Sequence, residues 1–338
     1  NCKSMIKKTI IIAEAGVNHN GKIDLAKKLI EKAKSAGADY IKFQLYNADE
    51  LVTESARKAK YQMNSLKKNE TQKKMLKQYQ LNELQIIKLF KYAKKNKIKF
   101  MLSVFDQESL NILKNIKLDF IKMPSGEINN FQLLKKVSKL NRNIIFSTGM
   151  STLSEIKKTY GFFKKNKKIK KIFVLHCNSS YPTPDGDVNI EVLSQFKKIF
   201  NSNIGYSDHS IGNEAAIVAV ALGAKIIEKH LTLNKKMSGP DHSSSSNPIE
   251  FKNLVNSIRK TEKFYNSKKK IVTKSEKENL PLVRKSIVAK KKILKGETFS
   301  EENLTIKRPG MGISPNFWNK IINKKSKYDF FKDDLIKV

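Results

Sequence analysis

Short β-branched runs alternate with longer amphipathic segments over the first 265 residues of the chain. Apolar runs of four to eight residues bounded by turn formers predict strands, and apolar residues at helical spacing predict the helices between them. In residues 25–36, for example, Leu25, Leu29 and Ala33 recur on one helical face. The strands predicted in this way are 9–16 (TIIIAEAG), 39–45 (DYIKFQL), 100–105 (FMLSVF), 120–125 (FIKMPS), 143–149 (NIIFSTG), 172–177 (IFVLHC), 204–209 (IGYSDH) and 225–232 (KIIEKHLT).

This alternation of strands and helices is typical of an α/β protein built from parallel βαβ units. Eight such units in about 260 residues match a (β/α)₈ TIM barrel in number and size. A doubly wound sheet is the alternative, but it rarely needs eight parallel strands. One connection, residues 46–79, is too long for a plain loop. In a barrel this insertion is expected to lie over the catalytic face as a lid.

The pattern changes after residue 265. Residues 268–277 are highly charged and predict a linker, and from about residue 282 short strands and turns follow one another. Ser300 has the residue type of an N-cap and predicts a short helix after it. We therefore expect a barrel over residues 5–265, a linker over 266–281 and a small C-terminal domain over 282–338. Residues 1–4 are left out of this interpretation.

The composition gives the chain a large positive net charge, which bears on whether it binds nucleic acid. The 338 residues include 67 Lys plus Arg against 31 Asp plus Glu, which gives a net charge of +36. A basic protein of this kind can bind nucleic acid, but only five of the cations are Arg, the residue that makes bidentate phosphate and guanine contacts. Lysines scattered along every helix favour an ordinary solvated surface, with nucleic-acid binding as the alternative.

Apolar stretches and cysteines bear on the cellular compartment. The longest apolar stretch, residues 215–224, is far shorter than the ~20 residues that span a bilayer. The two cysteines, Cys2 and Cys177, do not suggest a disulfide framework, and the short run at residues 10–12 does not resemble a secretory signal. These features predict a cytoplasmic protein without a membrane partner.

Polar side chains gather at the C-terminal ends of all eight predicted strands, where barrel enzymes carry their catalytic groups. Each of them alone has an ordinary structural explanation, but the series of eight favours a polar active site. In strand order they are Glu14, Asn18 and His19; Lys42 and Gln44; Ser103; Lys122, Ser125 and Glu127; Ser147 and Thr148; His176 and Tyr181; Ser207, Asp208 and His209; Glu228, Lys229 and His230.

The residue types narrow the chemistry. Two lysines, Lys42 and Lys122, with the hydroxyls of Ser103, Ser125 and Ser147 suit an anionic ligand that carries phosphate.

Two histidines, His209 and His230, end neighbouring strands, about 4.8 Å apart in a sheet, and could share one divalent metal with open positions for water or substrate. One packing and one hydrogen-bonded histidine is the alternative. Glu14, a carboxylate among cations, is the acid/base candidate. Walker, Rossmann, CxxC and GxSxG motifs are absent from the sequence, which disfavours nucleotide hydrolases, dehydrogenases, thiol redox enzymes and serine hydrolases.

Nine motifs in order along nearly the whole chain resemble the sialic acid synthase family, whose members make nonulosonic acids. These motifs are IIAEAGVNHNG (11–21), GADYIKFQ (37–44), KMPSGEINN (122–130), STGM (147–150), LHC with YPTP (175–184), GYSDHSIG (205–212), GAKIIEKHLT (223–232), GPDH (239–242) and KRPGMGIS (307–314).

The resemblance implies a TIM barrel followed by an antifreeze-like (SAF, β-clip type) domain, in a domain-swapped homodimer. It implies a reaction that joins phosphoenolpyruvate to an open-chain N-acylated mannosamine, with water, and releases phosphate. By resemblance, His209 and His230 are expected to bind Mn²⁺ or Mg²⁺, and Glu14 to handle the attacking water or its proton. The implied phosphoenolpyruvate ligands are Lys42, Ser103, Lys122, Ser125 and Ser147. The implied sugar ligands are Gln44, Glu127, Tyr181 and Asp241, together with Arg308 contributed by the other subunit.

The sequence departs from the family's motifs at two places. Residues 102–106 read LSVFD where the family has STPFD, and residues 178–180 read NSS where some bacterial members have a Thr-Asn pair. PSGE with GPDH fits the neuraminate and legionaminate branches better than the pseudaminate branch. We therefore expect an N-acetylneuraminate synthase, with an N,N'-diacetyllegionaminate synthase as the near alternative.

Overall fold

The computed structural model describes residues 8–59, 70–201, 203–265 and 269–338. The chain divides into two compact units, residues 1–266 and 267–338, which are described separately.

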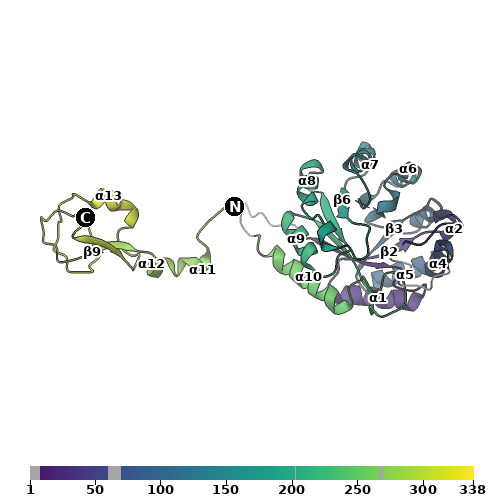
Figure 1. Ribbon diagram of the computed structural model, residues 1–338, viewed down its shortest axis with the longest axis horizontal. Helices are drawn as coiled ribbons and strands as arrows, with labels where there is room; N and C mark the ends of the chain where they lie inside the picture. The colour runs from purple at the N-terminus through teal and green to yellow at the C-terminus, as the bar shows by residue number, and fades with distance from the viewer. Residues whose placement is uncertain (1–7, 60–69, 202, 266–268) are drawn as a thin grey trace. The chain divides into compact units, whose positions relative to one another are not determined.

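In the first unit, eight strands form a closed barrel in sequence order, and each strand is parallel to its neighbours (Figure 1). The predicted TIM barrel is confirmed, and the strand bounds lie within two residues of those predicted. The strands are β1 (Ile10–Gly16), β2 (Tyr40–Leu45), β3 (Lys99–Val104), β4 (Phe120–Met123), β5 (Asn143–Ser147), β6 (Ile172–Cys177), β7 (Ile204–Asp208) and β8 (Ile226–His230).

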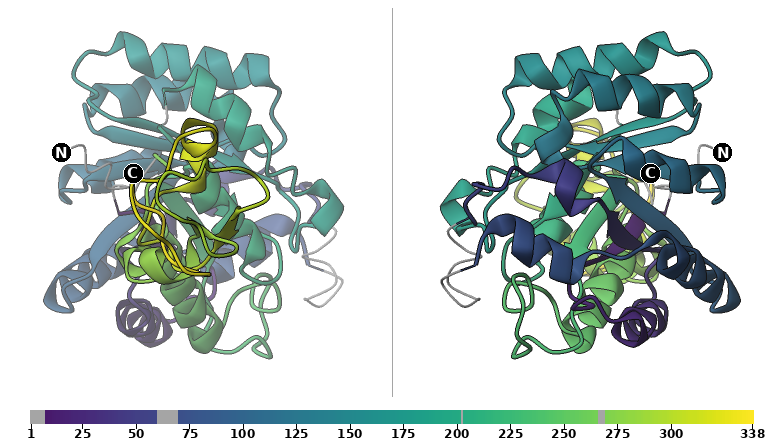
Figure 2. Two further views of the ribbon diagram at one scale, coloured as in Figure 1. Left: turned by 90° about the vertical axis from the view of Figure 1, so that its left-hand side faces the viewer. Right: turned by 90° about the vertical axis from the view of Figure 1, so that its right-hand side faces the viewer.

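Helices surround the strands on the outside of the barrel, as the views from two further sides also show (Figure 2). Their bounds follow local signals: α1, for example, ends at Gly37, whose φ of 90° is a left-handed conformation that glycine adopts without strain. The helices are α1 (Ile23–Ala36), α2 (Ala48–Leu51), α4 (Gln72–Tyr79), α5 (Glu83–Lys95), α6 (Phe131–Lys139), α7 (Leu153–Lys165), α8 (Val192–Ile199), α9 (Glu214–Leu222) and α10 (Pro248–Glu262), with 3₁₀ turns at Glu108–Lys114, Ser125–Glu127 and Asp185–Asp187.

Alternation of side chains along the strands divides the barrel into an outer and an inner face. Outward residues such as Ile11, Phe43 and Val174 join the large apolar core under the helices. The inner face begins with an apolar layer made by Ile12, Tyr40, Met101, Phe120, Ile145, Phe173, Leu175 and Ile226.

Further along the same inner face the side chains become polar. The inward position two residues past Ile12 is Glu14, and two past Tyr40 is Lys42. Residues continuing this alternation on the other strands are Ser103, Lys122, Ser147, Cys177, Ser207 and Glu228. The interior of the barrel thus has an apolar layer at the bottom and one layer of polar side chains above it.

In its described residues, the insertion after β2 forms two short helices, α2 and α4, which pack beside one another. Asn47 and Thr71 cap them, each accepting a hydrogen bond from a backbone N–H of its helix. Residues 60–69, in the middle of the expected lid, lie outside the described residues.

The second unit contains α11 (Lys274–Lys277), α12 (Leu280–Val283), the antiparallel strands β9 (Ser286–Ala289) and β10 (Leu304–Lys307), a 3₁₀ turn at Pro315–Phe317 and α13 (Trp318–Ile321). Its own core is formed by Ile287, Ala289, Ile293, Phe299, Leu304, Ile321, Phe330 and Ile336. The helix predicted after Ser300 is wrong: the Ser300 hydroxyl accepts from Glu302 N at 3.3 Å, but the chain makes only a turn and enters β10. Among the described residues, none of the helices has both the length and the apolar character needed to cross a membrane.

Candidate active site

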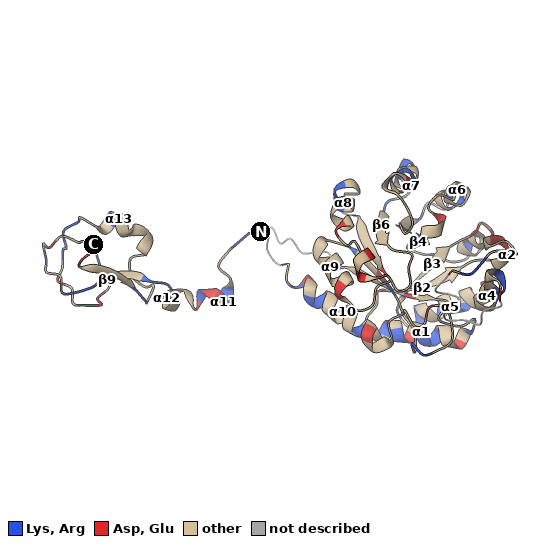
Figure 3. Cartoon of the chain, viewed as in Figure 1, with Lys and Arg blue, Asp and Glu red and all other residues tan. Residues whose placement is uncertain are grey.

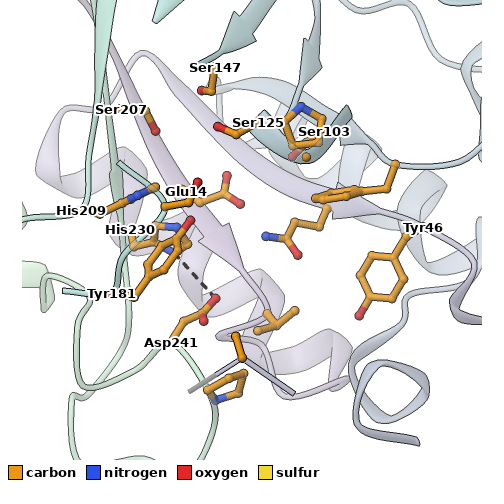
Figure 4. Close-up of a pocket in the computed structure, with 18 of the residues that line it drawn as sticks. Glu14, Tyr46, Ser103, Ser125, Ser147, Tyr181, Ser207, His209, His230 and Asp241 are labelled. Carbon is orange, nitrogen blue, oxygen red and sulfur yellow. Dashed lines mark ion pairs between the residues drawn. The ribbon is translucent and has the colours of Figure 1, made fainter. Parts of the chain in front are cut away.

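A cavity of about 410 Å³ opens at the C-terminal end of the barrel strands. It brings together eleven of the residues that the sequence proposed for the site. These are Glu14, Lys42, Gln44, Ser103, Lys122, Ser125, Ser147, Tyr181, His209, His230 and Asp241. In Figure 4, Ser103, Ser125 and Ser147 lie on one side of the cavity, and His209, His230 and Tyr181 lie on another, with Glu14 between the two groups.

Four buried charges form the floor of this cavity. The Lys42 ammonium lies 2.9 Å from a Glu14 carboxylate oxygen and 3.3 Å from Glu228 Oε1. Lys122 Nζ donates to the same Glu228 oxygen at 3.3 Å. Each of these side chains is at most 5% exposed, so water screens the pairs little. Glu228 therefore links the two cations into one network.

The protonation of this network follows from burial and from its partners. Burial raises the pKa of Glu14, and Lys42 offsets this only in part. Burial also favours the neutral form of Glu228, but Lys122 and Lys42 outweigh it and hold the pKa of Glu228 at about 2. Burial lowers the pKa of Lys122. Glu228 is thus fixed as an anion, and Glu14 is the carboxyl displaced towards taking up a proton.

Hydroxyls surround the two ammonium groups. Ser103 Oγ accepts from Lys42 at 3.2 Å, and Ser147 Oγ accepts from Lys122 at 2.7 Å. Ser125, at the start of a 3₁₀ turn after β4, accepts from the backbone N–H of Gly149 at 2.9 Å. Lysines and hydroxyls gathered in a closed space are the groups that bind phosphate and carboxylate oxygens.

The two histidines lie side by side, with ring centroids 5.4 Å apart. His209 Nδ1 is 2.6 Å from the carbonyl oxygen of Asn178. Because a carbonyl only accepts, Nδ1 carries the proton, and in the neutral imidazole Nε2 of His209 keeps a free lone pair. Within the described part of the chain, Nδ1 of His230 has no hydrogen-bond partner although the residue is buried.

Tyr181 and Asp241 line the cavity next to these histidines. The Tyr181 ring lies 4.1 Å from the His209 ring, centroid to centroid. A carboxylate oxygen of Asp241 is 3.9 Å from His230 Nδ1, the contact dashed in Figure 4. Burial, reinforced by the charge of Glu14, raises the pKa of Asp241 to about 7.

The donor chemistry here fits a divalent metal held by two imidazole nitrogens. The described residues contain no group of three or more His, Cys, Asp or Glu side chains placed to hold a metal ion. A metal at His209 and His230 would thus depend on oxygens of water or substrate for its other ligands, as an open site requires.

Two proposed site residues are not among those that line the cavity. Glu127 lies at the end of the 3₁₀ turn after β4, where its carboxylate accepts from Asn130 Nδ2 at 2.8 Å. Arg308 belongs to the second unit, where its Nε donates to the carbonyl oxygen of Val283 at 3.0 Å.

Two lining residues were named at strand ends but not assigned to the site from sequence, Glu228 and Ser207. The Ser207 hydroxyl donates to Glu228 at 2.9 Å. The missed signal is strand alternation: Glu228 precedes His230 by two residues and Ser207 precedes His209 by two, so both pairs share the inner face. By the same rule His176 points outward, where its ring stacks on Tyr206.

Comparison with known proteins identifies the family. The NeuB family profile matches residues 29–270, and the SAF domain profile matches residues 284–337. The chain belongs to the NeuB family. Its NeuB and SAF portions match the sequence prediction of a sialic acid synthase-like barrel with an antifreeze-like domain.

Relatives of this NeuB-family chain carry related names. N,N'-diacetyllegionaminic acid synthase of Campylobacter jejuni is 46% identical over 333 residues, covering 98% of this chain and 100% of that protein. The protein of the same name from Legionella pneumophila is 40% identical, covering 93% of this chain and 89% of its own length. The crystal structure of an N-acetylneuraminic acid synthetase from Leptospira borgpetersenii with citrate is 34% identical, with a TM-score of 0.71, covering 81% of this chain and 90% of that one. This NeuB-family chain is an enzyme of the nonulosonic acid synthase class.

The placement of charge agrees with an enzyme. Lys42 and Lys122 are buried in the cavity, whereas other lysines and arginines are spread over the outer helices, among them α1, α7 and α10 (Figure 3). An enzyme that binds an anionic substrate needs cations inside the site, as Lys42 and Lys122 are.

Proposed function

We propose that this chain condenses phosphoenolpyruvate with an open-chain N-acylated mannosamine to give a nonulosonic acid and phosphate. The observation that carries the proposal is the buried network of Lys42, Lys122, Glu14 and Glu228 beside paired histidines. C3 of phosphoenolpyruvate bonds to the aldehyde carbon, a water oxygen bonds to C2, and phosphate leaves from C2. Of the two protons of the water, one goes to the aldehyde oxygen and the other to the departing phosphate, which leaves a keto group at C2.

The protein's part in this reaction is to bind, orient and move protons. Lys42, Lys122 and the hydroxyls of Ser103 and Ser147 provide donors for the phosphate and carboxylate of phosphoenolpyruvate. Glu14 lies beside Lys42 with a raised pKa, which suits a carboxyl that takes up and releases a proton during the reaction.

Mn²⁺ or Mg²⁺ bound by His209 and His230 would polarise the sugar aldehyde as a Lewis acid. In neutral His209 Nε2 keeps a free lone pair, and among the described residues nothing bonds to Nδ1 of His230; both features support this pair as ligands. On the sugar side, Gln44, Tyr181 and Asp241 line the cavity and can contact hydroxyl or amide groups. Glu127 stays a proposed sugar ligand. To contact the sugar, its carboxylate has to turn away from the Asn130 side chain.

For the acceptor, we propose 2,4-diacetamido-2,4,6-trideoxymannose, which makes the chain an N,N'-diacetyllegionaminate synthase. The sequence favoured N-acetylmannosamine first, but the relatives at 46% and 40% identity both bear the legionaminate name, against 34% for the neuraminate synthetase. The insertion supports this order, because Leu51, Val52, Met75 and Leu76 give the cavity an apolar wall. A sugar with a C6 methyl and a second acetamido group offers more apolar surface to such a wall.

A single assay tests the reaction and its acceptor. Phosphate release should require phosphoenolpyruvate, Mn²⁺ and an amino-sugar acceptor, and should stop with chelator. Comparing kcat/KM for the 2,4-diacetamido sugar, N-acetylmannosamine and N-acetylmannosamine 6-phosphate should rank the first highest. If no acceptor supports turnover with Mn²⁺ present, the proposal fails; a higher kcat/KM for N-acetylmannosamine would overturn only the acceptor. His230→Ala should abolish turnover while its circular dichroism spectrum stays unchanged.

A role for Arg308 in the partner's site is proposed together with a homodimer, in which the guanidinium grips the sugar amide. Arg308→Ala should raise the acceptor KM and leave the KM of phosphoenolpyruvate unchanged. Mixing subunits tests the crossing directly, with His230→Ala chains refolded together with Arg308→Ala chains. If Arg308 acts across the dimer, each mixed dimer has one complete site, and about a quarter of wild-type activity returns. No recovery would place Arg308 outside the partner's site.

A cytoplasmic location stays a prediction.

A further inference from the structure

Two charged residues next to the paired histidines have no place in the cavity. Asp208 precedes His209 and Lys229 precedes His230, so strand alternation turns both to the outer face of the barrel. Both are buried, with exposed fractions of 1% for Asp208 and 4% for Lys229. Neither lines the cavity that holds the histidines. Their burial therefore calls for a role other than contact with substrate.

Lys229 holds the chain on both sides of His209. Its ammonium lies 2.6 Å from Asp208 Oδ2 and donates to the carbonyl oxygen of Ser210 at 2.8 Å. The other carboxylate oxygen of Asp208 accepts from Ser210 N at 2.9 Å and from Ser210 Oγ at 2.6 Å. Lys229, which precedes His230, is thus bonded to Asp208 and Ser210, the two chain neighbours of His209.

This contact lies where backbone pairing between the two strands stops. The β7–β8 ladder runs from Gly205 opposite Ile226 to Asp208 opposite Lys229 and ends there. The two histidines come one residue beyond its last pair, where the ladder no longer fixes the separation of the strands. The Asp208–Lys229 ion pair bridges the strands at this point.

Energetics favour a positioning role over a stabilising one. A buried ion pair loses hydration energy that its mutual attraction only roughly offsets, and an apolar pair of similar size often stabilises a protein as well or better. What the ion pair and its three hydrogen bonds with Ser210 supply is directional geometry at the backbone of His209. A metal site needs its ligands held to about 0.5 Å.

We propose that the Asp208–Lys229 ion pair is a positioning element that sets the separation of the His209 and His230 imidazoles. The inference rests on the proposed metal-binding role of these histidines. Lys229→Met is the test variant, because Asp208 keeps its two hydrogen bonds from Ser210 when the ammonium is removed. Lys99→Met, which removes the exposed ion pair with Asp119 at the other end of β3, is the matched control.

Metal-stripped protein is titrated with Mn²⁺, and free Mn²⁺ is measured by its electron paramagnetic resonance signal. Lys229→Met should bind Mn²⁺ about tenfold more weakly than wild type, the usual effect of losing a residue that orients a metal ligand. Lys99→Met should bind as wild type does, and Lys229→Arg, which keeps charge and donors, should recover part of the loss. A folded Lys229→Met protein with wild-type Mn²⁺ affinity would overturn the proposal.

Crystal structures of metal-free wild type and Lys229→Met separate this inference from the metal assignment. The distance between the ring centroids, 5.4 Å in the wild type, should change by about 0.5 Å or more in the variant. An unchanged distance refutes the positioning role. If the wild type binds no Mn²⁺, the metal role of the histidines fails, and the ring distance alone decides whether the ion pair positions them. Should Lys229→Met not fold, Ser210→Ala, which removes one bond to Asp208, is measured in the same two ways.

Discussion

Replacing Glu228 with Gln should destabilise the barrel, because it removes the anion that both buried lysines share. The carboxylate faces two cations, Lys42 and Lys122, at 3.3 Å each, and one anion, Glu14, so its net interaction is attractive. Its pKa is about 2 in the folded protein against an ordinary value of 4.5. At 1.36 kcal/mol for each pKa unit, this difference corresponds to about 3 kcal/mol of stability at pH 7.

Urea unfolding at pH 7 measures this loss. It is best followed by far-ultraviolet circular dichroism, because the single tryptophan, Trp318, belongs to the second unit. Glu191→Gln, an exposed site at the start of α8, makes the same chemical change and should alter stability by less than about 0.5 kcal/mol.

The pH dependence has a definite sign. A carboxyl whose pKa is lowered by folding stabilises the protein above its unfolded pKa and loses that contribution as pH falls. The gap between wild type and Glu228→Gln should thus be constant from about pH 6 to 8 and narrow below pH 4.5. A Gln variant as stable as the Glu191→Gln control at pH 7 would refute the reasoning.

Two further substitutions probe the barrel interior. Gly205→Ala should cost about 3 kcal/mol or prevent folding, because a Cβ there would lie 2.4 Å from Leu175 Cδ2 and 2.6 Å from the Ile226 carbonyl oxygen. Gly186→Ala is the control, since the space around it is open, and it should unfold at the wild-type urea midpoint. Equal midpoints for both variants would show that neighbouring side chains and backbone in the barrel shift to accept the extra methyl group. In chelator, Asp241→Asn should raise the unfolding free energy at pH 8 by up to about 4 kcal/mol, because an ordinary pKa of 3.8 raised to about 7 makes the ionised carboxylate unfavourable in the folded state. That gain should disappear as pH falls to 4, and a gain that does not depend on pH would assign the effect to something other than this ionisation.

The strands of the barrel could be predicted because each is a β-branched run between turn formers, and neighbouring runs support the same register. The polar residues at their ends could be predicted for the same reason, since βα units bring the C-terminal ends of all strands to one face. Glu228 could also have been assigned to the site, because it precedes His230 by two residues and strand alternation gives both side chains the same face. The apolar layer below, where Ile226 lies inside, agrees with that face.

The short elements were harder to predict, because local residue preferences compete there with tertiary contacts. Ser300 has a capping residue type, but its segment pairs with β9 soon afterwards, and Leu304 joins the core of the second unit instead of continuing a helix. Arg308 could not be placed for a different reason. The sugar that it is proposed to contact lies in the site of another subunit, so neither the sequence pattern nor the structure of one chain brings Arg308 and that sugar together.

Glu228 enters the site on the last strand of the barrel, and this affects how the enzyme is made. As the chain leaves the ribosome, Lys42 and Lys122 are synthesised long before the carboxylate that they share. Until β8 inserts between β1 and β7, Lys122 lacks its carboxylate partner Glu228, whereas Lys42 already has Glu14 on β1, so an unfinished barrel is expected to leave the Lys122 ammonium hydrated. Insertion of β8 is therefore expected to close the ring and to supply the anion that both lysines share in one step.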